Sequence, residues 1–426
     1  MIHETPFWWE TTTMPAGYSG VWAEAVDVAV IGSGITGLMA ARGLARRGAR
    51  VAVLEAETIG WGASSRNGGM TLSGLKVGAG ELFARYGRDL TRRLFAASLA
   101  AIAEVEAVVR EEGIACDFAR AGHLEVACKP AHQRGFERSA EVMAREFNHP
   151  VRLIAKADLR AEVDSGRYHG GLMDPASAGL NPARFVAGLA RAADRAGARL
   201  YAGAGVESVE RTGAGFRLRT ARGSLTAQHV VAATSGHTGR ATPALQRKIV
   251  PIGSYIIVTE PLEPEQARTL IPHRRMIFDS RNFLHYYRLT PDNRLLFGGR
   301  AAFFPETPAT VRESAAILQR EMAQVFPQLA GAPVSHVWGG TLDFAFDLMP
   351  HAGQVDGLYY ALGYAGHGVA LATYLGARLA DTLSGQAVDN PFAEIPFPGA
   401  PLGLYDGRPW FLPLAELWYR WLDWVS

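Results

Sequence analysis

A glycine-rich segment near the N-terminus has the residue types and the spacing that bind a pyrophosphate. In a GxGxxG turn, the first glycine permits a sharp bend, the second lets the main chain approach a phosphate, and the third lets a helix pack on a strand. Free amides and the positive end of the helix dipole then stabilise the negative charge without a lysine. We expect a dinucleotide at the turn formed by Gly32, Ser33, Gly34, Ile35, Thr36 and Gly37.

Glu55, which is followed by Ala56, stands 18 residues beyond the last of these glycines. A carboxylate at the end of the second strand of a dinucleotide-binding unit accepts hydrogen bonds from ribose hydroxyls and repels a 2′-phosphate. The position therefore favours FAD or NAD over NADP.

A second loop of small residues distinguishes between these two cofactors. Backbone amides of a segment so poor in large side chains can approach a large flat ligand, and Ser64 and Asn67 are able to bond phosphate or ribityl oxygens. Nicotinamide enzymes have no need of such a loop, so the loop favours FAD. Its expected cofactor contacts are Gly62, Ala63, Ser64, Ser65, Asn67, Gly68 and Gly69.

GxGxxG alone also marks purely structural turns, so the elements around it decide. The β-branched run at 26–31 predicts a buried parallel strand, 37–47 predicts a helix, and 51–54 predicts a second buried strand. Together they form a strand, turn, helix and strand within about 30 residues. Further along, the pattern predicts helices over 81–113 and 368–384, and antiparallel strands around 206–209 and 216–218.

The bulk composition excludes several other classes of protein. The 43 basic and 41 acidic residues nearly balance, and short arginine pairs are scattered along the chain, so no nucleic-acid partner is expected. Cys116 and Cys128 show no zinc or disulfide spacing, and no metal site is expected. No leader and no run of about 20 apolar residues is found, so the cytoplasm is the expected location.

The motifs DVAVIGSGITGL, VLEAETIGWGASSRNGG and RLLFGGR, with the aromatic N-terminal FWW and the C-terminal PWFLP, identify a family resemblance. Over nearly its whole length the chain resembles FAD-dependent oxidoreductases of the D-amino-acid-oxidase (DAO) type, and among them γ-glutamylputrescine oxidase-like bacterial enzymes. Met70 departs from the group, because relatives often have glutamine after the paired glycines. The resemblance implies an α/β Rossmann-type FAD-binding domain with an interleaved antiparallel-sheet (α+β) substrate domain.

The resemblance also implies domain limits and further cofactor contacts. The FAD-binding domain is expected over 26–80, 150–245 and 335–390, and the substrate domain over 81–149 and 246–334. An N-terminal arm covers 1–25, and a tail with an amphipathic helix covers 391–426. The added contacts are Met70, Val206 near the adenine, Ala233, Thr234, Gly340, Gly366, His367, Gly368 and Val369. Because no cysteine lies in the matching C-terminal region, we expect noncovalent FAD.

The antiparallel sheet of such proteins roofs the flavin and supplies the candidate catalytic residues. Strand alternation allows either Tyr287 alone, or Tyr286 with Arg288, to face the flavin. Arg288 has the geometry to pair with a substrate carboxylate, and Arg66 would favour reduced flavin. His367 either contacts the ring or substrate, or caps a helix. The candidates are Arg66, Tyr255, Tyr287, Arg288 and His367.

The expected reaction is oxidation of a carbon–nitrogen bond in an amine or amino acid to an imine, which water hydrolyses. The electrons pass to O2, or to a quinone or carrier if the protein is a D-amino acid or sarcosine-type dehydrogenase. A flavin-containing accessory subunit without activity is the non-enzymatic alternative. Residues 410–426 form an amphipathic, tryptophan-rich helix whose polar side is not basic, so packing on protein is favoured over membrane contact.

Overall fold

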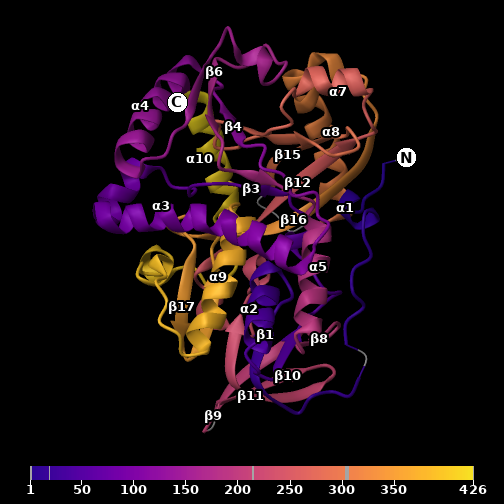
Figure 1. Ribbon diagram of the computed structural model, residues 1–426, viewed down its shortest axis with the longest axis vertical. Coiled ribbons are helices and arrows are strands. Elements are labelled where there is room, and N and C mark those ends of the chain that lie inside the picture. Colours follow the sequence, from indigo (N-terminus) through magenta and orange to yellow (C-terminus); the bar gives the residue numbers. More distant parts are fainter. Residues whose placement is uncertain (1, 19, 214, 303–306, 426) are drawn as a thin grey trace.

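Two large β-sheets form the framework of the protein, one in the lower half of Figure 1 and one in the upper half. The computed structural model describes residues 2–18, 20–213, 215–302 and 307–425. The chain passes repeatedly from one sheet to the other. The predicted fold class is confirmed, because a parallel-led sheet of Rossmann type is interleaved with a largely antiparallel second sheet.

The first sheet contains the predicted strand, turn, helix and strand. β1 pairs in parallel with β2 and with β11, so Val30 lies between Val53 and Val231. All three side chains are fully buried, because both faces of a parallel sheet are covered. The sheet order is β17-β18-β11-β1-β2-β8, with β1 (Ala25–Ile31), β2 (Val51–Leu54), β8 (Arg199–Tyr201), β11 (Gly223–Ala232), β17 (His351–Val355) and β18 (Leu358–Leu362).

Two strands extend this sheet as an antiparallel hairpin, as predicted. β9 (Val206–Thr212) pairs with β10 (Gly215–Thr220), and β10 pairs with β11. Val209 lies opposite Leu218. The hairpin lies at the bottom of Figure 1.

Two helices of the first domain begin side by side at one edge of its sheet. In α2 (Ile35–Ala45) and α9 (Gly368–Leu383), close contact requires a glycine, because a Cβ at Gly376 would lie 2.6 Å from the carbonyl oxygen of Thr36. The hydroxyls of Thr36 and Tyr364 lie 2.6 Å apart at the starts of the helices. α5 (Pro182–Arg195) packs on the other side of α2. Two helix N-termini, with their unpaired amides, therefore meet at the same place.

The second sheet has the order β16-β12-β15-β14-β13-β4-β6-β5. Its pairings are antiparallel except for the parallel pair β4 and β13. One face packs on α8 (Pro308–Val325) through an apolar core that includes Leu318 and Phe297. The strands are β4 (His123–Val126), β5 (Arg152–Ala155), β6 (Gly170–Asp174), β12 (Ile249–Thr259), β13 (Met276–Asp279), β14 (Tyr286–Leu289), β15 (Leu295–Ala302) and β16 (Val334–Ala345).

The domain limits expected from the sequence need correction in two places. The segment from 150 was assigned to the FAD-binding domain, yet β5 and β6 pair with each other and with β4 in the second sheet. The segment from 335 was assigned to the same domain, yet β16 pairs with β12 along its length. In both places the strands are too short or too uniformly apolar for the sequence to show which sheet they join.

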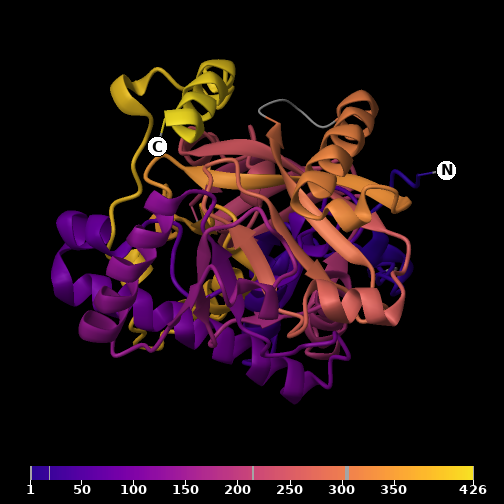
Figure 2. The same cartoon turned by 90° about the horizontal axis from the view of Figure 1, so that it is seen from above.

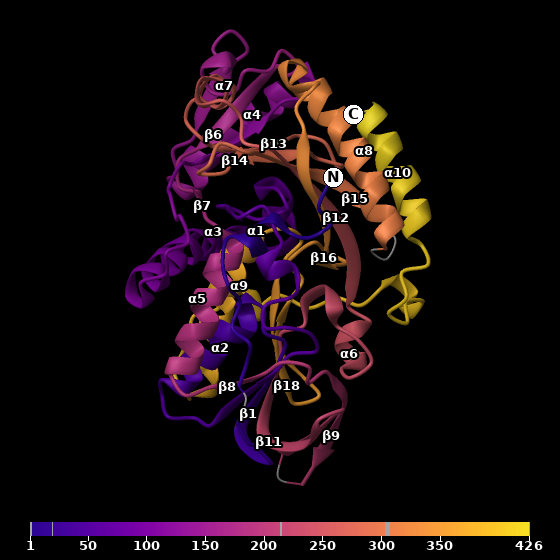
Figure 3. The same cartoon turned by 90° about the vertical axis from the view of Figure 1, so that its right-hand side faces the viewer.

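The remaining elements surround these sheets. The long predicted helix is α3 (Ala79–Glu112), which breaks at Gly87 and crosses beside α4 (Pro130–Phe147). Figures 2 and 3 show the C-terminal α10 (Leu412–Val425) at the periphery of the molecule, and Figure 2 shows that it lies apart from α8. The other elements are α1 (Phe7–Glu10), α6 (Pro243–Gln246), α7 (Pro264–Leu270), β3 (Met70–Thr71), β7 (Ala178–Gly179), η1 (Ala63–Ser65), η2 (Leu159–Ala161), η3 (Ser235–His237), η4 (Pro327–Leu329), η5 (Pro391–Ala393) and η6 (Pro401–Gly403).

Candidate active site

A cavity of about 1580 Å³ runs between the two sheets. At one end its wall is the glycine turn between β1 and α2, and at the other end it is formed by strands of the second sheet and by α3, α4 and α10. The start of α9 also lines the cavity. A cavity of this volume accommodates a dinucleotide and a small second molecule.

The glycine turn is closely packed against its surroundings. Gly32 has φ +99°, and a Cβ there would lie 2.7 Å from the carbonyl oxygen of Ala233. A Cβ at Gly37 would lie only 2.1 Å from the carbonyl oxygen of Gly32. Of the six predicted turn residues, Gly37 alone does not line the cavity, because it faces the strand, whereas Gly32, Ser33, Gly34, Ile35 and Thr36 do line it. The backbone at the start of α2 is thus presented to the cavity.

Glu55 lines the cavity beside this turn and holds it in shape. Its Oε2 accepts hydrogen bonds from the Ser33 amide at 2.9 Å and the Ser33 hydroxyl at 2.6 Å. Its Oε1 accepts a hydrogen bond from the Glu57 amide at 3.0 Å. Ala56 lines the cavity next to it. The carboxylate therefore has a structural task in addition to the ribose contact expected from the sequence.

The loop of small residues lies directly against the start of α2. The Ile35 amide donates to the Ser64 hydroxyl at 3.0 Å, and a Cβ at Gly34 would lie 2.9 Å from that oxygen. Asn67 uses its side chain within the loop, because it donates to the carbonyl oxygens of Ala63 and Ser64 and accepts from the Gly69 amide. The side chain of Asn67 therefore shapes the loop, whereas the sequence suggested that it bonds the ligand.

Not every predicted loop residue reaches the cavity. Ser65 is fully buried and donates to the carbonyl oxygen of Gly60, and a Cβ at Gly69 would lie 2.0 Å from the carbonyl oxygen of Leu180. These two residues support the loop from behind. The loop residues that do line the cavity are Gly62, Ala63, Ser64, Asn67, Gly68 and Met70.

Segments far away in the sequence complete the cofactor end of the cavity. They come from the start of β9, the end of β11, the strand β16 and the start of α9. The predicted residues among them that line the cavity are Val206, Ala233, Thr234, Gly340, Gly366, His367, Gly368 and Val369.

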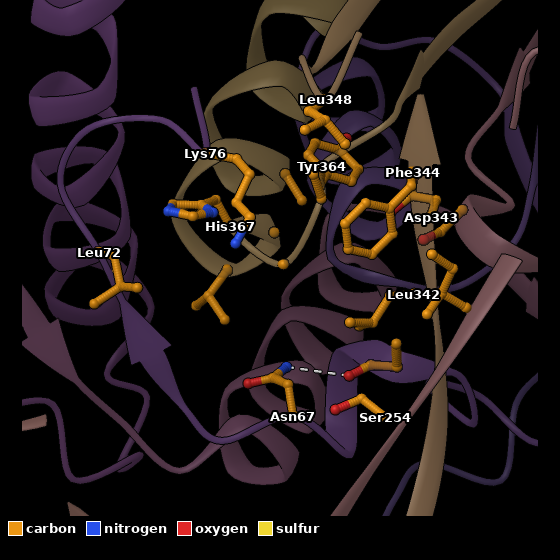
Figure 4. A pocket seen from close by; sticks show the side chains of 18 of the residues that line it. Asn67, Leu72, Lys76, Ser254, Leu342, Asp343, Phe344, Leu348, Tyr364 and His367 are labelled. Carbon is orange, nitrogen blue, oxygen red and sulfur yellow. Dashed lines mark hydrogen bonds between the residues drawn. The ribbon is translucent and has the colours of Figure 1, made fainter. Parts of the chain in front are cut away.

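His367 precedes the first turn of α9 and faces the cavity beside Lys76 (Figure 4). Its side chain makes no capping hydrogen bond, and its Nδ1 is buried without a hydrogen-bond partner among the described residues. Burial lowers the pKa of His367 to about 4, so the imidazole is neutral at neutral pH. Of the two interpretations that the sequence left open, the capping role is wrong, and a contact with cofactor or substrate stays a prediction.

The predicted catalytic residues on the second sheet are corrected by the geometry. Tyr255 and Tyr287 are fully buried in the core beneath α8, where the Tyr255 hydroxyl donates to Thr310 and the Tyr287 hydroxyl donates to Tyr168. Neither residue lines the cavity. The neighbour Tyr286, on the opposite face of β14, does line it. Alternation along the strand allowed both choices, and only packing could decide between them.

Arg288 is also turned away from the cavity. It is 6% exposed, and its Nη1 donates to the carbonyl oxygens of Gly69 at 2.8 Å and Leu180 at 3.0 Å. Burial lowers its pKa to about 10. Since the guanidinium is committed to two backbone oxygens, Arg288 positions the small-residue loop, and the carboxylate-pairing role expected from the sequence is not supported.

Arg66 does line the cavity, between two indole rings. Its guanidinium carbon lies 4.2 Å from the ring centroid of Trp61 and 4.7 Å from that of Trp9, and its Nε donates to the carbonyl oxygen of Trp61 at 2.7 Å. The cation is therefore fixed in place by stacking. Its proposed effect on the flavin stays a prediction.

Several cavity residues were missed by the sequence analysis. Lys76 lies in the loop before α3, and His123 and Glu125 lie on β4. The alternation His-Leu-Glu-Val in 123–126 is a two-residue period that places His123 and Glu125 on one face of a strand. That signal was available, but nothing in the sequence showed which face meets the cavity.

The predicted absence of a metal site remains a prediction. Among the described residues, one group has suitable ligands: His3, Glu10 and His336, whose ligand atoms lie within 4.8 Å of one another. Glu10 lies 3.0 Å from Nε2 of His336 and 3.5 Å from Nδ1 of His3. The group joins the N-terminal arm to β16 and lies outside the cavity.

The fold and the cavity define an FAD-binding protein of Rossmann type. The glycine turn, the carboxylate of Glu55 and the small-residue loop fit FAD, because a side chain at Gly34 would fill the close approach to Ser64 and the start of α2 supplies amides to phosphate. In a comparison with protein families, residues 27–382 match DAO, described as FAD dependent oxidoreductase. The chain belongs to this family.

Two relatives match most of the chain. The probable oxidoreductase OrdL of Rhizobium meliloti (strain 1021) is 33% identical over 402 residues, or 93% of this chain and 92% of that protein. The γ-glutamylputrescine oxidoreductase of Escherichia coli (strain K12) is 34% identical over 379 residues, or 88% of each chain. The recognition from sequence motifs is thereby confirmed.

A solved structure supports the fold. The crystal structure of glycine oxidase from Geobacillus kaustophilus is similar with a TM-score of 0.76 at 24% sequence identity, over 88% of this chain and 100% of that chain. The protein is thus an FAD-dependent oxidoreductase. Within the described part of the chain, no helix is long and apolar enough to span a membrane.

Proposed function

We propose that this protein oxidises the carbon–nitrogen bond of a small primary or secondary amine or amino acid to an imine, which water then hydrolyses. The observation that carries the proposal is the continuity of one cavity from the glycine turn to the polar residues Lys76, His123 and Glu125. The name of the E. coli relative makes γ-glutamylated amines the first substrates to try.

FAD supplies the chemistry when bound, since the flavin accepts a hydride from carbon. The chain's own residues orient the substrate and exclude water. His367 stays neutral at neutral pH because of its burial, and a neutral imidazole can accept or donate a hydrogen bond. The first turn of α9 directs its free amides into the cavity, where they stabilise negative charge.

FAD is proposed to bind without a covalent bond. Cys116 and Cys128 are free thiols, and neither lines the cavity. Acid precipitation is expected to release all of the yellow colour into the supernatant, and colour retained by the protein pellet would contradict this.

We propose O2 as the electron acceptor, with a quinone or carrier as the alternative for a dehydrogenase. The enzyme is first reduced anaerobically with an amine, and the return of the flavin absorbance is then followed after mixing with O2 or with a soluble quinone. Faster reoxidation by O2 supports an oxidase, and reoxidation by quinone alone supports a dehydrogenase.

The substrate class is tested by anaerobic bleaching. Purified holoenzyme is mixed with amines and amino acids, and the visible absorption band of the oxidised flavin is followed. Bleaching by an amine supports the proposal. If no amine or amino acid bleaches the flavin, the proposed function is wrong and the non-enzymatic alternative is favoured.

A further inference from the structure

The cavity-facing side of the second sheet carries one charged residue within an apolar row. Strand pairing places Glu125 between Leu172 and Phe278, and Phe278 next to Tyr286. All four residues line the cavity. The intervening residues of β4, Leu124 and Val126, are fully buried in the core on the other face. A carboxyl group thus projects from an otherwise apolar and aromatic row of side chains.

Lys76 approaches the same space from the FAD-binding domain. It lies in the loop between β3 and α3, and Figure 4 shows its side chain beside His367. The Lys76 side chain is exposed to the cavity; partial desolvation by the surrounding protein lowers its pKa, and the nearby Glu125 raises it. An ammonium group and a carboxyl group from different elements thus line the same cavity, close enough to influence each other's pKa.

Neither charged group has a protein partner. Among the described residues, Lys76 and Glu125 form no ion pair and no side-chain hydrogen bond, with each other or with any other residue. Other acidic side chains of the cavity wall are paired: Asp174 with His149 at 2.9 Å, and Asp279 with Arg281. Both groups are accessible from the cavity, and a charged group on a cavity wall is stabilised when a ligand brings the opposite charge. A ligand with both charges would supply both partners.

The surroundings leave these two groups to carry the charge. Burial lowers the pKa values of His123 and His367 to about 4, so both imidazoles are neutral at neutral pH. The His123 ring stacks on Phe278 at 5.2 Å between centroids, and its Nδ1 lies 2.8 Å from the Ser177 hydroxyl. The histidines therefore shape the chamber, and they do not neutralise Glu125.

We propose that Lys76 and Glu125 form a two-point subsite for a zwitterionic amino acid, in which Lys76 binds the carboxylate and Glu125 binds the ammonium group. The subsite rests on the proposed function and narrows its substrate class from amines in general to amino acids. Simple amines lack the group that Lys76 requires. Two opposite charges supplied by different elements also fix the orientation of the bound molecule.

The test uses compounds in matched pairs, each an amino acid and the amine that lacks its carboxylate. Suitable pairs are sarcosine with dimethylamine, proline with pyrrolidine, and lysine with 1,5-diaminopentane. The holoenzyme is reduced anaerobically by each compound, and the apparent Kd and limiting rate of flavin reduction are measured separately. We expect at least one amino acid to bind about 10- to 100-fold more tightly than its partner amine, as for a charged hydrogen bond.

Two variants assign this preference to residues. Lys76→Met keeps the length of the side chain and removes its charge, and we expect it to abolish the preference for the amino acid while leaving the Kd of the amine within about threefold. Glu125→Gln is expected to weaken the binding of both the amino acid and its partner amine. The exposed residues Lys156 and Glu137 provide the matched controls Lys156→Met and Glu137→Gln, which should change neither value. FAD content and thermal midpoint check that each variant is folded.

Binding without turnover separates this inference from the proposed function. Propionate, which has a carboxylate and no amine, is titrated into the oxidised holoenzyme, and the shift of the flavin spectrum gives a Kd. A Kd raised at least tenfold in Lys76→Met supports the subsite, even if no amine reduces the flavin. If amines reduce the flavin but Lys76→Met changes neither the propionate Kd nor the preference, the subsite is wrong and the proposed function stands.

Discussion

The two ends of the cavity are built in opposite ways. At the cofactor end, Glu55 accepts hydrogen bonds from Ser33, and Ser64 accepts one from the Ile35 amide, at 2.6 to 3.0 Å; the residues come mostly from one continuous stretch of chain. At the substrate end, Lys76 and Glu125 come from different domains and have no partner among the described residues. A prearranged turn suits the cofactor, which is always the same molecule. Unpaired charges suit the selection of one substrate among several.

This contrast makes the cofactor end sensitive to shape and the substrate end sensitive to charge. A methyl group added at the glycine turn meets backbone atoms that cannot move aside. Removing the charge of Lys76 or Glu125 at the substrate end disturbs no hydrogen bond in the protein, because neither side chain forms one with another described residue. Substitutions at the two ends should therefore differ in whether stability or selectivity changes.

The largest effect is expected for Gly37→Ala. Its Cβ would lie 2.1 Å from the carbonyl oxygen of Gly32 and 3.1 Å from Val30. We expect α2 to shift from the sheet, with a loss of about 3 kcal/mol in the free energy of unfolding and loss of most bound FAD. Denaturant unfolding and the FAD content of the purified protein measure the two effects. Gly331→Ala, where a Cβ meets nothing within 4 Å, is the control and should be close to neutral.

A smaller loss at the same end is expected for Glu55→Ala. The substitution leaves the Ser33 amide and hydroxyl and the Glu57 amide without their acceptor. Unsatisfied donors of this kind cost about 1 to 3 kcal/mol, and FAD affinity should fall together with stability. Fluorescence titration of apoprotein with FAD measures the affinity. Glu207→Ala, at an exposed position outside the cavity, is the control and should change neither quantity. Equal effects of both substitutions would show that Glu55 has no special role.

At the substrate end the expected effect depends on pH. Burial raises the pKa of Glu125 to about 7; Asp279 also raises it, and Lys76 opposes the shift. Since the carboxyl must be ionised to bind an ammonium group, affinity for the substrate should rise about tenfold from pH 6 to pH 8. The Kd of flavin reduction across this range measures it, and Glu125→Gln should flatten the profile. His123 and His367, with pKa values of about 4, do not contribute above pH 6.

The same raised pKa affects stability with the opposite sign. The unfolded chain ionises Glu125 at its ordinary pKa, so the folded state is favoured by the proton at low pH and loses that advantage as pH rises through about 7. The stability of Glu125→Gln relative to the natural protein should therefore improve from pH 5 to pH 8. If the difference in free energy of unfolding between the two proteins is the same at every pH, the carboxyl of Glu125 does not have a raised pKa in the folded state.

The smallest effects are expected for two neighbouring tyrosines on β14. Tyr287→Phe removes a hydroxyl that donates to Tyr168 in the core, at 3.1 Å, and should cost about 1 kcal/mol of stability without changing substrate binding. Tyr286→Phe removes a hydroxyl 3.2 Å from that of Ser254 at the cavity, and should change the Kd of flavin reduction more than stability. If Tyr287→Phe changed substrate binding and Tyr286→Phe changed only stability, the cavity would lie on the Tyr287 face of β14.

The sequence predicted the cofactor end well because its geometry is local. The turn from Gly32 to Gly37 and the strand that ends at Glu55 are set by nearby residues, and the cavity contains most of the predicted contacts. The substrate end was predicted poorly. Whether Tyr286 or Tyr287 faces the cavity depends on which side α8 covers, and Lys76 becomes important only through the position of β4, about 50 residues away in the chain.

The alternation of the chain between the two sheets has a consequence for folding. β1 and β2 lie in the first sheet, β4 to β6 in the second, β8 to β11 in the first, β12 to β16 in the second, and β17 and β18 in the first again. No single cut in the chain separates one complete sheet from the other. During synthesis, the first sheet must wait for residues beyond 350 before its last strands can join. A ligand held at the junction therefore stabilises both halves at once, and loss of FAD should lower the unfolding temperature of the entire protein in one transition.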